Sequence, residues 1–163
     1  MTADAVVFPV ELRQQLIEHA LEGDPDEVCG ILAGRDGRVE RVFRVRNSAD
    51  EIAPDRQVFR DRQSGEATSG HKPVHYFMDP KDQLRVYNEI DDLELDVVGY
   101  YHSHTHTEAR PSPTDIRLSF DSHAYWVLVS LQDRANPHVR VWNILKDDPG
   151  DETGTLVERD TTA

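Results

Sequence analysis

Residues 97–115 read VVGYYHSHTHTEARPSPTD, which joins a buried-strand pattern to a cluster of potential metal ligands. The apolar run at the start is typical of a buried strand. Side chains two residues apart in a strand point to one face, so we expect His102 and His104 to face one ion together. The polar spacer after them is expected to leave the sheet and let Asp115 return as a third ligand. Two histidines and one carboxylate leave the fourth position of a zinc ion open, which is typical of catalytic zinc.

The same stretch is also a helix start. Ser112 is a good N-cap, Pro113 suits the first turn, and Asp115 places an acid three residues after the cap. The two interpretations are compatible, because a helix over about 113–120 would direct Asp115 from its first turn toward the metal. A single histidine is more often a surface or core residue than a ligand. It is the conjunction of the His-x-His pair with the capped helix that favours a metal site.

A hydrolytic zinc site also needs a group that moves protons to and from water. The best candidate is Glu27, which lies between a predicted amphipathic helix and the apolar strand 28–33. A carboxylate at the mouth of a buried strand is partly desolvated, and desolvation raises its pKa. The residues alone leave the alternative open, because acidic residues that follow a helix are usually solvated.

Together, these residues resemble the signature of the JAMM (MPN+) metalloprotease family. The resemblance extends over about 6–145, and every motif position is filled by Glu27 before CGILAG and by the pattern His102-Ser103-His104-x7-Ser112-x2-Asp115. It implies one zinc ion per chain, with His102, His104 and Asp115 as ligands. It also implies Glu27 as general base and acid, and Ser112 as the donor to the oxyanion.

Within this family, residues 102–112 are most similar to short bacterial members that release cysteine from a ubiquitin-like sulfur-carrier protein. The resemblance implies hydrolysis of the amide bond after a C-terminal Gly-Gly of such a carrier, releasing cysteine or a C-terminal extension. Two alternatives stay open: a zinc isopeptidase or amidase of other specificity (deubiquitinase-like or cell-wall type), and a non-catalytic MPN scaffold. His106 departs from the expected small or polar residue, and we interpret it as a solvated loop residue.

Composition is consistent with an enzyme of modest size. A length of 163 residues suits one domain, and a net charge of −13 argues against nucleic acid or an anionic membrane surface as partner. No apolar run approaches the roughly 20 residues that span a bilayer. The N-terminus lacks the basic region of a signal peptide, so we expect a cytoplasmic protein. The single Cys29 excludes an internal disulfide and is interpreted as a buried filler. A homodimer is left open.

The expected fold class is α/β. Periodicity predicts helices over 10–21 and 81–93, strands over 28–33, 39–46, 124–130 and 139–145, and a hairpin turn at 35–38. In the second helix, Leu84, Tyr87 and Ile90 are expected to face inward. The resemblance implies a single MPN-type domain over 6–146, with a curved mixed central sheet flanked by helices.

Two segments lack a core pattern. The polar insertion 50–75 is expected to be a lid or disordered, apart from a short strand over 74–77. Its His71 and His75 are not expected to form a second metal site, because no carboxylate or thiol spacing supports one. The acidic segment 147–163 is predicted to be a disordered tail.

Overall fold

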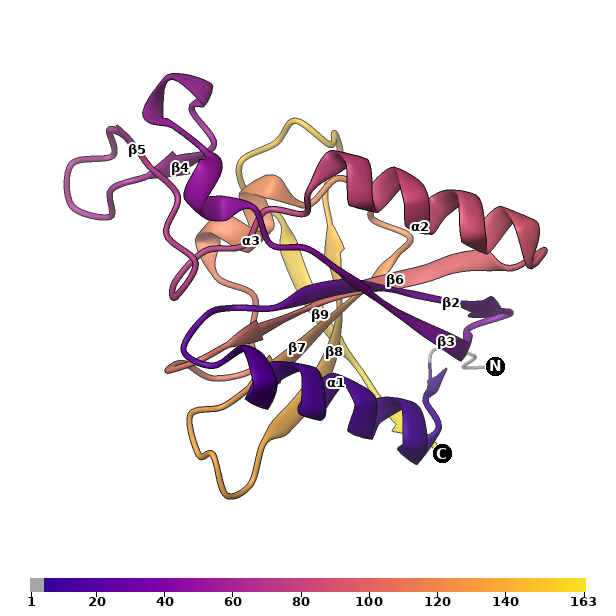
Figure 1. Ribbon diagram of the computed structural model, residues 1–163. Coiled ribbons are helices and arrows are strands. Elements are labelled where there is room, and N and C mark those ends of the chain that lie inside the picture. Colours follow the sequence, from indigo (N-terminus) through magenta and orange to yellow (C-terminus); the bar gives the residue numbers. More distant parts are fainter. Residues whose placement is uncertain (1–4) are drawn as a thin grey trace.

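An eight-stranded mixed sheet organises the protein, in the order β10-β1-β3-β2-β6-β7-β8-β9 (Figure 1). The computed structural model describes residues 5–163. The strands of this sheet are β1 (Val6–Val7), β2 (Cys29–Arg35), β3 (Arg38–Val45), β6 (Asp96–His104), β7 (Tyr125–Ser130), β8 (His138–Leu145), β9 (Thr155–Arg159) and β10 (Thr161–Thr162). The helices are α1 (Val10–Gly23), α2 (Pro80–Asp92) and α3 (Pro113–Leu118). Each helix and strand predicted outside the insertion is present, with bounds shifted by a few residues.

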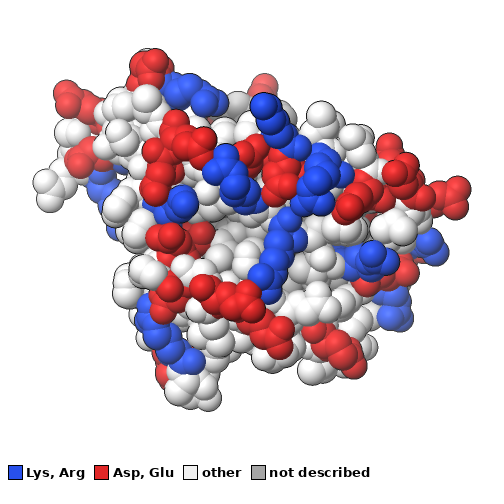
Figure 2. Space-filling view, viewed as in Figure 1, with Lys and Arg blue, Asp and Glu red and all other residues white. Residues whose placement is uncertain are grey.

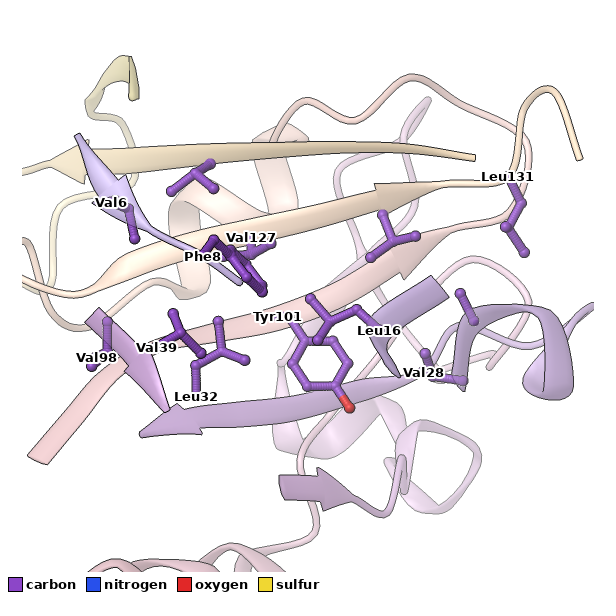
Figure 3. Close-up of a cluster of buried hydrophobic side chains, with 13 residues drawn as sticks. Val6, Phe8, Leu16, Val28, Leu32, Val39, Val98, Tyr101, Val127 and Leu131 are labelled. Atoms are coloured by element: carbon purple, nitrogen blue, oxygen red, sulfur yellow. The ribbon is translucent and has the colours of Figure 1, made fainter. Parts of the chain in front are cut away.

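Two hydrophobic clusters lie on opposite faces of the sheet because strand side chains alternate. On one face, α1 packs through Leu16 and Ala20 onto a cluster that includes Tyr101 of β6 (Figure 3). On the other, α2 packs through Val86 onto a cluster that includes Tyr100. Figure 1 shows the two helices flanking the sheet from either side. The strand β6 therefore lies at the centre of the core, and it ends at the two histidines of the motif.

The pairing of β6 brings distant segments to the motif. This strand pairs antiparallel with β2, where Cys29 lies opposite His102. It pairs parallel with β7, where Leu128 lies opposite His102. Because both edges are occupied, the two histidines project from a strand that cannot shift its register without losing two ladders.

The C-terminal segment is more ordered than its composition indicates. The prediction of a disordered tail over 147–163 is wrong, because β9 pairs antiparallel with β8 and β10 pairs parallel with β1. Leu156 of β9 is half-buried against the cluster of Ala109, Leu128 and Trp142. The acidic side chains stay at the surface while the backbone completes the sheet, so a high count of acids did not prevent strand formation.

The insertion 50–75 is neither one long loop nor disordered. It holds two 3₁₀ turns, η1 (Ala49–Glu51) and η2 (Pro54–Arg56), and a hairpin of β4 (Phe59–Arg60) with β5 (Ala67–Thr68). A small cluster of Ala49, Ile52 and Phe59 anchors it. The short strand predicted over 74–77 is absent. In its place a turn leads to one isolated bridge between Asn47 and Met78.

Acidic and basic side chains are interspersed over the face seen in Figure 2. Many are paired, as where Arg44 and Glu22 approach to 2.6 Å. Exposed pairs of this kind contribute little stability. No helix among residues 5–163 is long and apolar enough to cross a membrane.

Candidate active site

The motif residues meet at the end of β6. His102 and His104 are 2% and 5% exposed and lie two residues apart on the strand. Asp115 reaches them from the first turn of α3, which Ser112 begins as N-cap with a complete capping box. The Nε2 atoms of both histidines lie 3.0 Å from Asp115 Oδ2. One ligand atom from each of the three residues lies within 4.8 Å of the others, the arrangement expected from the sequence.

The polar contacts of this cluster fit a bound cation. His102 Nε2 is buried and makes no hydrogen bond within residues 5–163, because its contact with Asp115 lacks hydrogen-bond geometry. A buried imidazole nitrogen without a hydrogen bond is costly unless something else binds it. Two ligand atoms of tetrahedral zinc would stand about 3.3 Å apart for bonds of 2.0–2.1 Å, close to the observed 3.0 Å. Two imidazoles and one carboxylate are also the donors that zinc prefers.

The charges of the cluster are strongly coupled. Burial lowers the pKa of His102, and the opposing attraction of Asp115 does not restore it, so its imidazole is neutral and able to bind a metal. Burial also acts to lower the pKa of His104, but its hydrogen bond and charge interaction with Asp115 outweigh burial and raise that pKa to about 9. Burial would raise the pKa of Asp115, yet the two histidines hold it below its ordinary value. The carboxylate is therefore ionised.

Neighbouring groups orient the ligands. His104 Nδ1 hydrogen-bonds the carbonyl oxygen of Glu108 at 2.9 Å, which places the ring hydrogen on Nδ1 and leaves Nε2 for the metal. The ring of Tyr76 stacks on His102 with centroids 4.2 Å apart. The backbone N–H of Ser112 donates to Asp115 Oδ2 at 2.8 Å. Sequence reasoning missed the roles of Tyr76 and the Glu108 carbonyl, because neither lies at a recognisable motif spacing.

Glu27 lies buried beside the cluster, 8% exposed. Burial raises its pKa well above the usual value, the charge of Asp115 raises it further, and His104 opposes both. Its backbone is fixed by a bond from its N–H to the Lys72 carbonyl at 2.8 Å and by Asn47 Nδ2, which donates to its carbonyl. The solvated alternative considered for Glu27 is therefore wrong.

Ser103, between the two histidines, ties the strand that follows Glu27 to the motif strand. Its Oγ accepts a hydrogen bond from the Val28 N–H at 2.9 Å, and its own N–H donates to the Val28 carbonyl at 3.0 Å. The side chain is fully buried. The sequence signal was available, since a Ser between two inward histidines faces the opposite side of a buried strand and needs a partner there.

The other candidates have simpler roles. Ser112 is half-buried, and its Oγ accepts from the Asp115 N–H at 3.1 Å, which leaves its hydroxyl hydrogen free to donate. Burial raises the pKa of the Cys29 thiol, which is consistent with the buried filler expected from the sequence. His106 is exposed in the loop, as expected. His75 stacks on Phe59 and accepts from the His71 N–H, and within residues 5–163 neither histidine belongs to a group of potential metal ligands.

The chain matches the family described as prokaryotic homologs of the JAB domain over residues 9–145. It belongs to the JAB (JAMM/MPN) family. The chain is 31% identical over 160 residues to the CysO-cysteine peptidase of Mycobacterium tuberculosis, covering 97% of this chain and 95% of the relative. It is 29% identical over 132 residues to the desampylase of Haloferax volcanii, covering 78% and 82%.

Two solved structures agree with the fold. A solution structure of a protein from Desulfitobacterium hafniense superimposes with a TM-score of 0.72 at 28% identity, covering 96% of this chain and 91% of that one. A JAB1/MPN domain protein from Archaeoglobus fulgidus gives 0.52 at 16% identity, covering 97% and 98%, and supports the fold alone. The expected family, the α/β MPN-type fold and the assignment as a peptide-bond hydrolase are confirmed.

Proposed function

We propose that this JAB protein is a zinc-dependent peptidase that hydrolyses the amide bond after the C-terminal Gly-Gly of a ubiquitin-like sulfur-carrier protein. The bond broken would release cysteine or a C-terminal extension. The observation that carries the chemistry is the convergence of His102, His104 and Asp115 beside a buried glutamate of raised pKa. The choice of substrate is supported by the identity to a CysO-cysteine peptidase along nearly the whole chain.

Each motif residue has a defined task in this proposal. His102, His104 and Asp115 would hold one zinc ion, which supplies a Lewis acid that lowers the pKa of water to near ~7 and polarises the scissile carbonyl. Glu27, buried beside the three ligands, would accept a proton from the attacking water and return it to the leaving amine. The free hydroxyl hydrogen of Ser112 is available to the oxyanion.

The strand pairing limits how a Gly-Gly tail approaches. Both edges of β6 are occupied, so an extended tail cannot add beside the motif strand. The insertion lies next to the site instead, since Thr105 Oγ1 donates to the Pro73 carbonyl and Arg117 Nη2 donates to the Val58 carbonyl. We propose that the tail lies between the insertion and the site, where glycines pass because side chains do not fit.

A second specificity has its own support. The identity to a desampylase supports the alternative of a zinc isopeptidase of other specificity. The zinc-loaded protein should be incubated with a carrier that ends in Gly-Gly-Cys, a carrier with a longer extension, a carrier in isopeptide linkage, and a cell-wall peptide. Mass spectrometry then identifies the bond broken. A carrier ending in Ala-Ala-Cys is the matched control for the glycines.

The outcomes distinguish the proposed function from its alternatives. Cleavage of the Gly-Gly-Cys or extended carrier alone supports the proposal, and preferential cleavage of the isopeptide supports the desampylase-like specificity. Release from the cell-wall peptide alone would overturn a carrier as substrate. No cleavage by protein with stoichiometric zinc would favour the non-catalytic scaffold. Light scattering of the same sample tests the homodimer.

A further inference from the structure

Trp142 of β8 contacts Ala109 in the loop that follows the metal-ligand strand β6, and it takes no part in the proposed reaction. We propose that Trp142 is a positioning residue that holds the ligand His104 in its metal-binding orientation through the loop after β6. This inference rests on the zinc site of the proposed function and is independent of its substrate. The connection passes through two successive backbone carbonyls, those of Glu108 and Ala109.

The two carbonyls face different partners. The Glu108 carbonyl accepts from His104 Nδ1 at 2.9 Å and from the Arg110 N–H at 2.8 Å. The next carbonyl, that of Ala109, accepts from Trp142 Nε1–H at 2.9 Å. Adjacent peptide groups share a Cα. The hydrogen bond from the indole fixes the peptide plane of the Ala109 carbonyl, and this restricts the neighbouring plane of the Glu108 carbonyl, which orients His104. On the other side, Ser130 Oγ of β7 donates to the Thr107 carbonyl at 2.5 Å, so the peptide plane of the Glu108 carbonyl lies between two neighbours that are each bonded to a strand.

Packing reinforces the hydrogen bond. Ala109 is 1% exposed, and it forms a buried cluster with Leu128 and Trp142. Leu128 lies opposite His102 in the ladder between β6 and β7. The side chain of Ala109 and its carbonyl are therefore both held by the same tryptophan. A small residue at this position lets the loop lie directly on the indole ring.

The indole is itself fixed from several sides. Trp142 is 3% exposed on a strand paired with β7 and β9. The guanidinium carbon of Arg140 lies 4.6 Å from its ring centroid, and that of Arg110 lies 5.5 Å away. Arg140 also forms two hydrogen bonds of 2.9 Å with Glu158 of β9. The position of the ring is thus set by the sheet and by charged groups that stack on it.

Groups that hydrogen-bond a ligating histidine fix its tautomer and ring orientation, and their loss typically costs 10–100-fold in metal affinity. Trp142 acts one step further out than the Glu108 carbonyl. Replacing Trp142 with Phe removes the N–H donor, and we expect it to weaken zinc binding by about 10-fold, the lower end of that range.

The chain offers a matched control in Trp126. It is also 3% exposed, and its Nε1–H donates to a backbone carbonyl, that of Asp121, at 3.3 Å. It lies on the neighbouring strand directly opposite Trp142, but its N–H bonds the Asp121 carbonyl and not the loop that orients His104. Trp126→Phe therefore makes the same chemical change in a similar environment, and zinc affinity should fall by clearly less than the roughly 10-fold expected for Trp142→Phe, because the carbonyl that loses its donor is that of Asp121.

Zinc affinity is measured by chelator competition, and the visible spectrum of the cobalt-substituted protein reports ligand geometry without any assay of activity. Thermal unfolding of the metal-free variants measures any general loss of packing. We expect both variants to lose stability, and only Trp142→Phe to weaken zinc binding by about 10-fold and change the cobalt spectrum. Equal effects of the two variants on zinc, or no effect of either, would overturn the proposal.

A second variant separates loss of the hydrogen bond from loss of packing by the ring. The benzothiophene analogue of tryptophan at position 142 replaces the indole N–H by sulfur and keeps the ring shape. Weaker zinc binding in this variant supports the role of the hydrogen bond, and unchanged binding refutes it. Because no substrate is present in these measurements, failure of the proposed carrier as substrate would not mimic either result.

Discussion

Glu27→Gln should make the metal-free protein more stable and the zinc-loaded protein nearly inactive. Burial raises the pKa of Glu27 well above its usual value, with the charge of Asp115 as the second cause. An acid whose pKa is higher in the folded than in the unfolded state destabilises the fold as the pH rises above the unfolded value. Each unit of such a shift costs about 1.4 kcal/mol, and the cost is complete once the pH exceeds the folded value.

Glutamine keeps the shape of Glu27 and removes this cost. Metal-free Glu27→Gln is therefore expected to melt above the wild type at pH 7.5, by about 2–4 °C for each kcal/mol regained in a chain of this size. The two melting temperatures should converge near pH 4, where the carboxyl is protonated in both states. The metal-free form is used because a cation beside Glu27 would change its pKa. With zinc bound, turnover should fall by the roughly 10²–10⁴ that general acid–base catalysis supplies.

The assay is thermal unfolding of protein treated with a chelator, from pH 4 to pH 8, beside turnover of the zinc-loaded form. Glu22→Gln is the control, because Glu22 is exposed and its hydrogen bond to Arg44 lowers its pKa. Because this ion pair is exposed, that variant should shift stability only slightly, in the opposite direction, and leave turnover unchanged. A Glu27→Gln protein that melts below the wild type at every pH would refute the desolvation argument. Near-normal cleavage with full zinc would show that another group moves the proton.

Three further predictions follow from the structure. His104→Ala should lose stoichiometric zinc, as measured by elemental analysis. In the wild type, protons compete with zinc for His104, whose pKa is about 9, so zinc affinity measured by chelator competition should fall about tenfold per pH unit between pH 8 and 7. Ser112→Ala should lower turnover by less than the ~10²–10³ of a sole oxyanion donor, and urea unfolding should show about 1 kcal/mol lost with the N-cap. Burial lowers the pKa of His19 to about 4, so its contribution to stability is complete above pH 6.5 and is lost as the pH falls toward 4. His19→Gln should show a smaller acid loss in the same titration, and an unchanged loss would contradict this assignment.

The metal ligands were predictable because they depend on local rules. His102 and His104 share a face of one strand, and the cap at Ser112 fixes the direction of Asp115 within a single turn. Each relation spans only a few residues, where side-chain direction follows directly from secondary structure. Glu27 was different, since its proximity depends on the pairing of β2 with β6 across about 75 residues of chain. No local pattern specifies that pairing, and only the family resemblance supplied it.

The inward face of α2 was predicted only in part. Leu84, expected to face the core, is 59% exposed, while Val86 is fully buried and was not selected. Steps of three residues advance 300° around a helix, so a series 84, 87, 90 drifts by about 60° per step away from its starting face. Val86 and Ile90 are four apart and stay on one side, and Tyr87 borders them. A stripe assigned from steps of three alone therefore rotates off the core within two turns.

The C-terminal strand β9 shows why an acidic composition wrongly predicted disorder. Whether this segment is ordered depends on its pairing with another strand. Acidic residues discourage burial, but β9 buries little and gains its order from backbone bonds to β8 and from half-buried Leu156. Its Glu158 is held by Arg140, the same side chain that stacks on Trp142. A boundary drawn after residue 146 would therefore remove a strand that supports the tryptophan behind His104. An acidic residue on an edge strand is compatible with order when an arginine of the paired strand bonds it, as Arg140 bonds Glu158. The sequence does not show this ion pair, because it depends on which strands are paired.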